Sequence, residues 1–292
     1  MSRIGLLFPG QGSQATGMGQ DLYNLMPSAK KIMDDANDIL GFDIRGMIFN
    51  GVLEELTRTE NAQPAIFIVS AMYFEKYKEL DIPFEIVAGH SLGEYSALYA
   101  ADVFGFEEGL RLVRKRALAM ESILEKGAMF AIMGMPLEQI EDGLKEYDGK
   151  VVIANINSKS QIVISGYEEE TTQAASDFSK VNDTQVRQLN VSTAFHSPLM
   201  QEAEKTMATE IDKIEFNDPT CFVIPNFTAT PSKDINEIKD ALKKQITGRV
   251  NWLDTILSIK NMGIEQLYEV GYGDVLRKLN KAITLRPKCL SL

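Results

Sequence analysis

Short apolar runs alternate with longer amphipathic segments over the first part of the chain. Residues 4–8 and 85–88 are mostly apolar and are followed by proline or glycine, as buried strands often are. The segment 64–80 begins with a proline, which a helix tolerates in its first turn. Strands that alternate with helices predict an α/β layer around a mostly parallel sheet. We expect helices at residues 28–40, 64–80, 91–101 and 106–124. Apolar positions have helical spacing in the first of these, and the segment 91–101 is rich in Leu, Ala and Glu.

The order of elements changes between residues 127 and 195. Here the pattern predicts strand, helix, two strands, helix and strand, at residues 128–133, 136–147, 151–154, 161–165, 168–181 and 185–189. The order β-α-β-β-α-β is that of a ferredoxin-like unit. After this segment, strands alternate with helices again, as they do in the first part of the chain. We therefore expect an α/β core of residues 1–126 and 196–292, interrupted by a ferredoxin-like subdomain at residues 127–195.

Charge and hydropathy exclude two classes of partner. The chain has 30 Lys and Arg against 41 Asp and Glu, a formal net charge of −11, whereas nucleic-acid-binding proteins present a basic field. No apolar run approaches the roughly 18 residues of a membrane helix. The first ten residues reach Pro-Gly too early to hold the apolar region of a signal peptide. We expect a cytoplasmic protein of enzyme size that binds neither nucleic acid nor membrane.

Cysteine and histidine are too scarce to suggest a metal centre. Cys221 and Cys289 are expected to be reduced thiols, because nothing indicates a disulfide scaffold. His90 and His196 lie far along the chain from both cysteines, which disfavours a zinc site. Carboxylate-bound magnesium stays open, although no acidic spacing points to it. We expect no metal and no cofactor.

The segment 86–94 places G-x-S-x-G between a predicted strand and a predicted helix. On such a turn the serine backbone is crowded, so its neighbours two positions away must lack side chains, as Gly89 and Gly93 do. The hydroxyl of Ser91 then projects above the sheet edge, and the N–H of Leu92 can face a developing oxyanion. The pattern predicts a serine nucleophile. The alternative is a serine that caps a helix between two turn glycines.

A serine nucleophile needs a base, and histidine is the usual one. His90 adjoins Ser91 on the same tight turn, so its side chain should point elsewhere. If Ser91 is catalytic, His196 is the base by elimination. Ser197 and Pro198 suit the N-cap and first position of a helix, whose positive end favours a neutral imidazole. No acidic residue is placed to complete a triad, and a backbone carbonyl can orient the ring instead.

A glycine-rich loop at residues 8–15 formally matches the dinucleotide pattern G-x-G-x-x-G/A. Dinucleotide binding also needs an acidic residue on a second strand about 20 positions later. Asp34 and Asp35 lie within a helical stretch instead, so we reject nucleotide binding. If the loop lies near Ser91, the N–H of Gln11 is a second candidate oxyanion donor. The alternative is a plain strand-to-helix turn.

Arg116 is unusually placed on its predicted helix. It falls on the flank of an apolar stripe formed by Leu110, Val113, Ala117 and Met120. A cation beside a core face needs an anionic partner. That partner is either a structural Asp or Glu, or a substrate carboxylate held by the planar guanidinium.

Taken in order along the chain, these motifs resemble the malonyl-CoA:acyl carrier protein transacylase family. The similarity spans essentially the whole chain and is most like that of free-standing, trans-acting polyketide-synthase acyltransferases. It implies a hydrolase-like α/β core with an inserted ferredoxin-like subdomain. The motifs that carry it, besides those at residues 10–14, 89–95 and 116, are Gln63-Pro64-Ala65, Ala194-Phe195-His196-Ser197, Val250-Asn251-Trp252 and Glu269-Val270-Gly271.

The resemblance also implies a role for each candidate residue. Ser91 would carry the acyl group with His196 as its base, and the N–H groups of Gln11 and Leu92 would stabilise the oxyanion. Arg116 would pair with the free carboxylate of malonyl. The acyl donor would be malonyl-CoA and the acceptor the phosphopantetheine thiol of an acyl carrier protein, in polyketide or fatty-acid biosynthesis.

Further implications of the resemblance concern orientation and acyl choice. The backbone carbonyl of Asn251 would orient His196, which explains the missing acid. Leu92 and the Ala194-Phe195 pair are similar to the malonyl-type pattern. Two positions depart from the pattern of polyketide members: Thr193 and Tyr272.

Two other functions stay open at this stage, a hydrolase that removes acyl groups from carrier proteins and a non-catalytic module that binds them. Carrier proteins of this kind are acidic, and so is this chain, so docking would need a local basic surface. One candidate, which we call the C-terminal basic patch, consists of Arg277, Lys278, Lys281, Arg286 and Lys288. The alternative is a solvated basic end of a helix.

Overall fold

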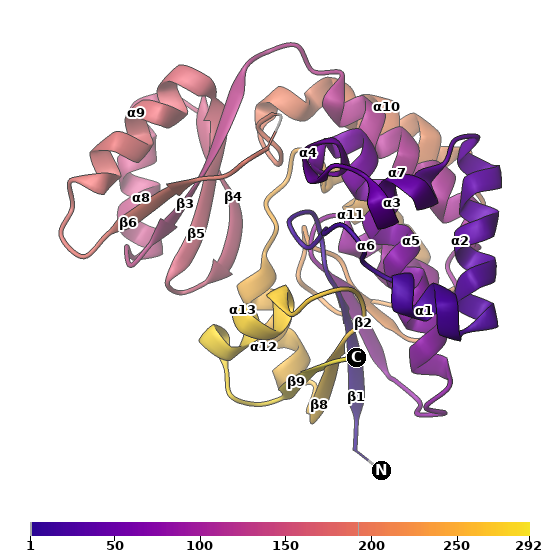
Figure 1. The fold of residues 1–292 in the computed structure, drawn as a ribbon. Coiled ribbons are helices and arrows are strands. Elements are labelled where there is room, and N and C mark those ends of the chain that lie inside the picture. Colours follow the sequence, from indigo (N-terminus) through magenta and orange to yellow (C-terminus); the bar gives the residue numbers. More distant parts are fainter. Residues whose placement is uncertain (1, 192) are drawn as a thin grey trace.

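The computed structural model describes residues 2–191 and 193–292, which form two lobes (Figure 1). The larger lobe holds a five-stranded sheet in the order β7-β2-β1-β8-β9, and every strand pair in it is parallel. The predicted α/β core with a parallel sheet is therefore confirmed. Its strands are β1 (Ile4–Phe8), β2 (Ile86–Gly89), β7 (Phe222–Ile224), β8 (Gln266–Glu269) and β9 (Lys288–Ser291).

Successive residues of β1 pack on opposite faces of this sheet. Leu6 and Phe8 belong to the core that contains α5 (Thr59–Lys78), α6 (Gly93–Ala100) and α7 (Phe106–Glu121). Leu7 belongs to the core that contains α12 (Trp252–Asn261) and α13 (Val275–Ile283). Because both faces are covered, the strand is apolar throughout rather than alternating.

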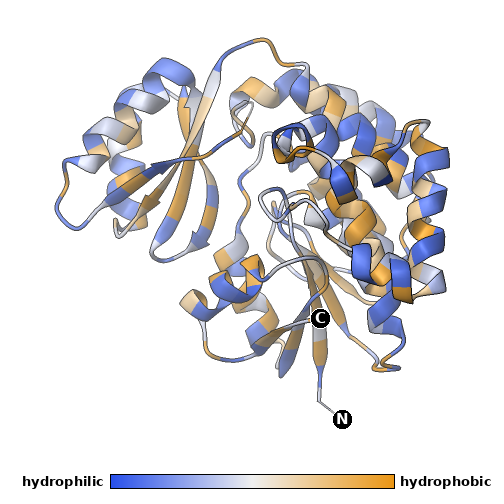
Figure 2. Ribbon diagram, in the orientation of Figure 1, coloured by the Kyte–Doolittle hydropathy of each residue, from blue (hydrophilic) through white to orange (hydrophobic). Residues whose placement is uncertain are grey.

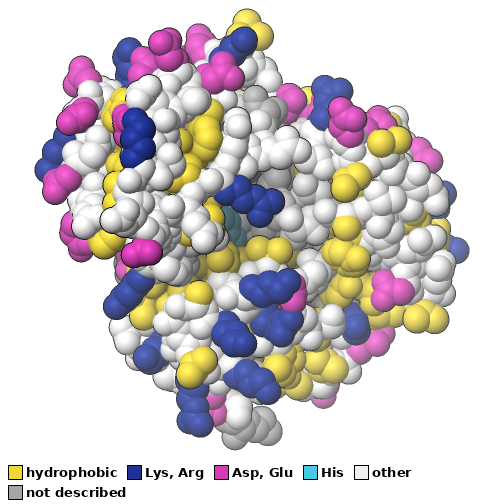
Figure 3. Space-filling model, turned by 60° about the vertical axis from the view of Figure 1, so that its left-hand side comes forward, with side chains coloured by type: hydrophobic (Ala, Val, Ile, Leu, Met, Phe, Trp, Pro, Cys, Tyr) yellow, Lys and Arg dark blue, Asp and Glu magenta, His cyan; other side chains and the backbone are white. Residues whose placement is uncertain are grey.

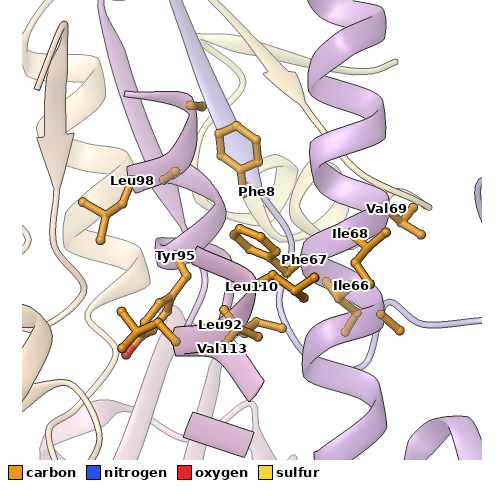
Figure 4. Packing of buried hydrophobic residues seen from close by; sticks show 14 of the residues in the cluster. Phe8, Ile66, Phe67, Ile68, Val69, Leu92, Tyr95, Leu98, Leu110 and Val113 are labelled. Atoms are coloured by element: carbon orange, nitrogen blue, oxygen red, sulfur yellow. The ribbon is translucent and has the colours of Figure 1, made fainter. Parts of the chain in front are cut away.

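The turn after β2 is packed into the core of the larger lobe. Leu92 and Tyr95 are fully buried and belong to the same cluster as Phe67 of α5 and Leu110 of α7, which Figure 4 shows from close by. Close packing of this kind leaves little room for a side chain or main chain to shift. Ser91, which lies between β2 and α6, is thus held by the core on its C-terminal side.

The long helix α5 begins at Thr59, five residues earlier than predicted, and Pro64 lies inside it. A proline inside a helix leaves the carbonyl four residues earlier without its N–H donor. That carbonyl, of Glu60, accepts a hydrogen bond from Nη1 of Arg114 on α7. The helix can run through Pro64 because the neighbouring helix supplies the missing donor.

Several short elements were not predicted, because four to seven residues are too few to show a period. They are β9 and three helices of the larger lobe, α1 (Gln20–Leu25), α3 (Ile44–Asn50) and α4 (Leu53–Thr57). Figure 2 shows hydrophilic residues along the outer side of the larger lobe, which includes α2. Among the described residues, no helix has both the length and the apolar character that crossing a membrane requires. The other helices of this lobe are α2 (Pro27–Leu40), α10 (Gln201–Asp212), α11 (Ile235–Lys244) and the 3-10 turn Pro198–Met200.

The smaller lobe is an antiparallel sheet in the order β4-β5-β3-β6, with two helices packed on it. The order along the chain is β3-α8-β4-β5-α9-β6, so the predicted ferredoxin-like insertion is confirmed. Its elements are β3 (Gly127–Met133), α8 (Leu137–Leu144), a 3-10 turn (Lys145–Tyr147), β4 (Val151–Ser158), β5 (Gln161–Tyr167), α9 (Glu168–Ser179) and β6 (Gln185–Gln188).

A main-chain contact joins the smaller lobe to the larger one. The N–H of Val250 donates to the carbonyl of Ala154 on β4 at 2.8 Å, and the N–H of Ile156 donates to the carbonyl of Val250 at 3.0 Å. Hydrogen bonds between main-chain groups depend on position rather than residue type. The two lobes are therefore fastened at the segment that precedes α12.

Candidate active site

Ser91 lies on the sharp turn between β2 and α6 in a left-handed backbone conformation, with φ of 50°. Such a conformation is uncommon for a residue other than glycine. A Cβ added to Gly89 would lie 1.9 Å from the main-chain carbonyl of Gly93, and one added to Gly93 would lie 2.1 Å from the carbonyl oxygen of Phe8. Both positions therefore require glycine, as the G-x-S-x-G pattern indicated.

His196 lies beside Ser91 although the two are 105 positions apart, with Nε2 2.7 Å from Oγ. It comes from the segment that returns from the smaller lobe. Ser197 caps the 3-10 turn that follows, where its side chain accepts a hydrogen bond from the N–H of Leu199. A hydroxyl hydrogen-bonded to an imidazole nitrogen can lose its proton to that nitrogen as it attacks.

The other ring nitrogen of His196 faces two main-chain carbonyls, those of Gln245 at 2.8 Å and Gly248 at 3.1 Å. A carbonyl only accepts hydrogen bonds, so Nδ1 carries the proton and Nε2 is left to accept one. The prediction that the carbonyl of Asn251 orients the ring is wrong. Asn251 caps α12, and its carbonyl accepts from the N–H and the hydroxyl of Thr255.

Burial keeps His196 neutral. The side chain is 3% exposed, and burial together with the positive charge of Arg116 lowers its pKa to about 3. The sequence predicted a neutral imidazole and attributed it to the following helix. In the structure the main cause is burial, followed by the neighbouring guanidinium. At neutral pH the ring is able to accept a proton from Ser91.

The guanidinium of Arg116 is buried and extends to the hydroxyl of Ser91, with Nη2 3.1 Å from Oγ. Its other partners are side-chain oxygens of two amides, those of Gln63 at 2.7 Å and Gln245 at 3.0 Å. Among the described residues, no acidic side chain forms an ion pair with it. Arginine stays protonated in proteins even where burial lowers its pKa, as it does here. A buried cation whose hydrogen-bond partners are all neutral is suited to an incoming carboxylate.

The glycine-rich loop after β1 lies against the turn that carries Ser91. A Cβ added to Gly10 would lie 2.2 Å from the carbonyl oxygen of His90, so only glycine allows this approach. The main chains of Gln11 and Leu92 are therefore brought to the same edge of the sheet, one from each of two neighbouring strands. Oxyanion stabilisation by their N–H groups stays a prediction.

A hollow of about 510 Å³ opens beside His196, between the two lobes. Figure 3 shows a hollowed face of the molecule, with a histidine side chain visible inside the hollow and a group of Lys and Arg side chains below it. His196 therefore borders an opening on the surface of the molecule. Besides His196, the lining residues are Val152, Ile153, Pro198, Gln201, Glu204, Lys205, Thr247 and Arg249.

Comparison with known proteins agrees with this geometry. The model of the acyl transferase domain family matches residues 6–263. The chain belongs to this family. The polyketide biosynthesis malonyl CoA-acyl carrier protein transacylase PksC of Bacillus subtilis (strain 168) is 41% identical over 279 residues, which cover 94% of this chain and 95% of the relative. The malonyl CoA-acyl carrier protein transacylase of the same organism is 39% identical over 298 residues, which cover 100% and 94%.

A solved structure is also similar to this acyl transferase over its whole length. It is a malonyl-transacylase in complex with its type II PKS acyl carrier protein, with a TM-score of 0.95 and 34% identity over 100% of this chain and 96% of that one. The fold and the long coverage leave no segment of the two lobes without a counterpart. The likeness thus extends to both lobes.

Two glutamines of this acyl transferase belong to the site although sequence analysis gave them no role. Gln63 of α5 is 1% exposed and holds Nη1 of Arg116. Gln245 follows α11 and uses its main-chain carbonyl for His196 and its side chain for Arg116. Gln63 is the first residue of the Gln-Pro-Ala motif, and that motif could have identified it as a site residue. Gln245 had none, because every residue type carries a main-chain carbonyl.

His90 points away from Ser91, as predicted. Its Nε2 donates to Oδ1 of Asn157 on β4 at 2.8 Å, and burial lowers its pKa. The neutral ring thus connects the turn of the larger lobe to the smaller lobe. It has no contact that would make it a base for Ser91 among the described interactions, which leaves His196 in that position.

Proposed function

We propose that this chain transfers a malonyl group from malonyl-CoA to the phosphopantetheine thiol of an acyl carrier protein, in fatty-acid or polyketide biosynthesis. The observation that carries the proposal is the buried guanidinium of Arg116, with Nη2 3.1 Å from Oγ of Ser91. A malonyl group on this oxygen has its free carboxylate one methylene beyond the ester carbonyl. The carboxylate then lies within reach of the guanidinium, which binds such groups through charge-assisted hydrogen bonds.

In the first half of the reaction, Oγ of Ser91 attacks the thioester carbonyl while Nε2 of His196 accepts its proton. The carbonyl oxygen becomes negatively charged, and the N–H groups of Gln11 and Leu92 stabilise it. The carbon–sulfur bond then breaks, and the thiol of coenzyme A leaves with the proton from His196. The product is an ester of malonate with Ser91.

In the second half, the thiol of the carrier protein attacks this ester and gives its proton to His196. The bond between the acyl carbon and Oγ breaks, and the proton returns to Ser91. The malonyl group leaves as a new thioester, and the reaction needs no cofactor besides its substrates. Water must be kept from the ester between the two halves, because hydrolysis would release malonate.

Intact-mass measurement tests the proposal in both halves. Mixing with malonyl-CoA should give one malonyl adduct on the wild type and none on Ser91→Ala, and addition of a phosphopantetheinylated carrier protein should move the adduct to the carrier. An absent adduct, or one that persists in Ser91→Ala, would indicate a non-catalytic binding module. An adduct that ends as free malonate in the presence of the carrier would indicate a hydrolase.

The similarity to a malonyl-transacylase solved with its carrier protein supports the choice of acceptor. Arg116 supports transfer over the hydrolysis of simple acyl chains, because an acyl group without a second carboxylate gives the guanidinium no anionic partner. The same experiment with acetyl-CoA compares the loading of an acyl group that lacks the second carboxylate with the loading of malonyl. Equal loading by acetyl and malonyl groups would contradict the malonyl assignment.

A further inference from the structure

We infer that Asn226 is a positioning residue that holds the backbone of Ser91, an inference that rests on the proposed role of Ser91 as the nucleophile. The argument begins with the end of strand β7. This strand pairs in parallel with β2, and the last pair in register is Ile224 with Ala88. The next residue on the β7 side is Pro225, which has no N–H to donate. The ladder therefore stops just before the turn that carries Ser91.

The side chain of Asn226 takes over from the ladder at this point. Its Oδ1 accepts a hydrogen bond from the N–H of Ser91 at 2.6 Å, and its Nδ2 donates to the carbonyl of Gly89 at 2.6 Å. A side-chain amide has the same donor and acceptor as a peptide group. Asn226 thus bridges the two main-chain groups that flank His90, where a further residue of β7 would otherwise pair.

Asn226 is itself fixed by its own main chain. The residue is fully buried, its N–H donates to Oε2 of Glu94 at 3.0 Å, and its carbonyl accepts from the N–H of Asn251 at 3.1 Å. Buried hydrogen bonds on both sides of a residue leave its side chain few alternatives. The amide is therefore held in place before any substrate arrives.

The other side of Ser91 is held in a similar way. Nε2 of Gln245 donates to the carbonyl of Ser91 at 2.9 Å and to the same Oε2 of Glu94 at 2.7 Å. One oxygen of Glu94 thus accepts hydrogen bonds from both Asn226 and Gln245, the two residues that bond the main chain of Ser91. A left-handed conformation at a serine persists only where the surrounding structure imposes it. Asn226 imposes it from the N-terminal side and so sets where Oγ meets His196.

Asn226 acts on the nucleophile and not on the acyl group. Its described hydrogen bonds reach Ser91, Gly89, Glu94 and Asn251, and none reaches Arg116. Loss of its side chain should therefore slow the reaction of Ser91 while the binding of malonyl-CoA changes little. Replacement of a residue that only supports the fold would lower stability, but it would not slow the reaction of Ser91 while leaving the binding of malonyl-CoA unchanged.

The experiment compares the full-length variants Asn226→Ala and Asn226→Asp with the wild type. Asn280→Ala is the matched control, because Asn280 is also buried and its side chain accepts from Trp252 but does not contact Ser91. Two rates are measured on protein shown by thermal melting to be folded. One is the labelling of Ser91 by a fluorophosphonate probe, and the other is its loading by saturating malonyl-CoA in a single turnover. Because the probe carries no carboxylate and no coenzyme A, it reports on Ser91 even if malonyl transfer is not the function.

We expect Asn226→Ala to slow both rates by about 100-fold, the size of effect that a small misplacement of a reacting group produces. The half-saturating concentration of malonyl-CoA should stay near the wild-type value. Asn226→Asp retains the acceptor for the N–H of Ser91 and loses the donor to Gly89, so it should show a smaller loss. Asn280→Ala should label at the wild-type rate.

Three outcomes would overturn the inference. The first is a folded Asn226→Ala that labels at the wild-type rate. The second is an equal loss of labelling in Asn280→Ala. The third is a loss that lies entirely in the half-saturating concentration of malonyl-CoA. If Asn226→Ala does not fold, Asn226→Asp decides, and labelling of that variant at the wild-type rate overturns the inference.

Discussion

Arg116 donates a hydrogen bond to the hydroxyl of Ser91, with Nη2 and Oγ 3.1 Å apart. A guanidinium has only donors, so the oxygen must accept from it. The hydroxyl proton is then left to point at Nε2 of His196, which lies 2.7 Å from the same oxygen. One arginine thereby orients the proton of the nucleophile and, in the proposed function, also binds the carboxylate of the acyl group.

Replacement of Arg116 by alanine should weaken malonyl loading and spare acetyl loading by comparison. Hydrogen bonds to charged groups contribute about 1.5–3 kcal/mol each, so we expect malonyl loading to fall by roughly 10- to 100-fold. The measurement is the initial rate of adduct formation on Ser91 with each acyl-CoA. Arg111→Ala on the exposed side of the same helix, where it pairs with Glu107, should keep the wild-type preference. Equal losses with both acyl groups would contradict the prediction.

The reactivity of Ser91 should persist to acid pH. The pKa of His196 is lowered to about 3 from its ordinary 6.5, so the ring stays able to accept a proton well below neutral pH. Fluorophosphonate labelling should therefore be nearly constant from about pH 8 to about pH 5, with circular dichroism to confirm folding. Arg116→Ala removes a positive charge beside the ring and should move the acid limb to higher pH. A wild-type limb centred near the ordinary histidine pKa would refute this.

Glu94 should make the protein less stable as the pH rises. Burial raises its pKa to about 7 from 4.5, so the folded state holds a proton that the unfolded state releases between these values. That contribution is fully present below pH 4.5 and is lost as the pH rises through 7, by about 3 kcal/mol in total. Glu94→Gln lacks this loss, so its stability relative to the wild type should increase from pH 5 to pH 8 in urea unfolding. A constant difference between the two proteins would disprove the assignment.

Gly89→Ala should prevent the turn at Ser91 from forming. The added methyl group would lie 1.9 Å from main-chain atoms of Gly93, which no side-chain movement can relieve. Overpacking of this severity costs about 3 kcal/mol or more, so we expect a large drop in the melting temperature and no labelling of Ser91. Gly105→Ala is the control, since its methyl group would meet only a side-chain oxygen at 3.7 Å. A stable, reactive Gly89→Ala would show that the turn adopts another backbone path.

The C-terminal basic patch should serve the carrier protein and not malonyl-CoA. Four of its five residues line one hollow of about 550 Å³ beside α13 and β9. Arg277 and Lys278 pair with Asp274, whereas Lys281 and Lys288 have no acidic partner among the described residues. Charge complementarity acts mainly on encounter, so Lys281→Glu with Lys288→Glu should slow transfer to the carrier about tenfold and leave loading of Ser91 unchanged.

The control for the patch is the pair Lys30→Glu and Lys31→Glu on α2. Figure 1 shows α2 on the side of the larger lobe away from α13, and both lysines are exposed. This variant carries the same change in net charge. Equal slowing in both double variants would assign the effect to net charge, and no slowing in either would exclude the patch as the docking surface.

The elements that position the nucleophile could be predicted from the sequence because each has a local cause. The apolar run at residues 4–8 and the glycines around Ser91 are imposed by a buried strand and a crowded turn. Arg116 stood out because a cation on an apolar flank needs an explanation. The start of α5 could not be predicted, since the donor that compensates for Pro64 comes from Arg114, on a different helix.

The groups that orient Ser91 and His196 were the part that sequence reasoning missed. The ring of His196 is oriented by main-chain carbonyls of Gln245 and Gly248, which any residue could supply. The expectation for Asn251 failed because helix capping already engages its carbonyl. Contacts of this kind depend on where two distant segments meet, and no local pattern of side chains records that.

The main-chain pairing of Val250 with β4 limits how the lobes can be recombined with those of relatives. The carbonyls that orient His196 belong to Gln245 and Gly248, a few residues before this pairing. A chimera that takes the smaller lobe from another acyltransferase would press a foreign strand against the native segment and shift the imidazole. A chimera designed to alter acyl choice should therefore take two segments from the same donor protein. One is the inserted lobe, and the other is residues 245–250.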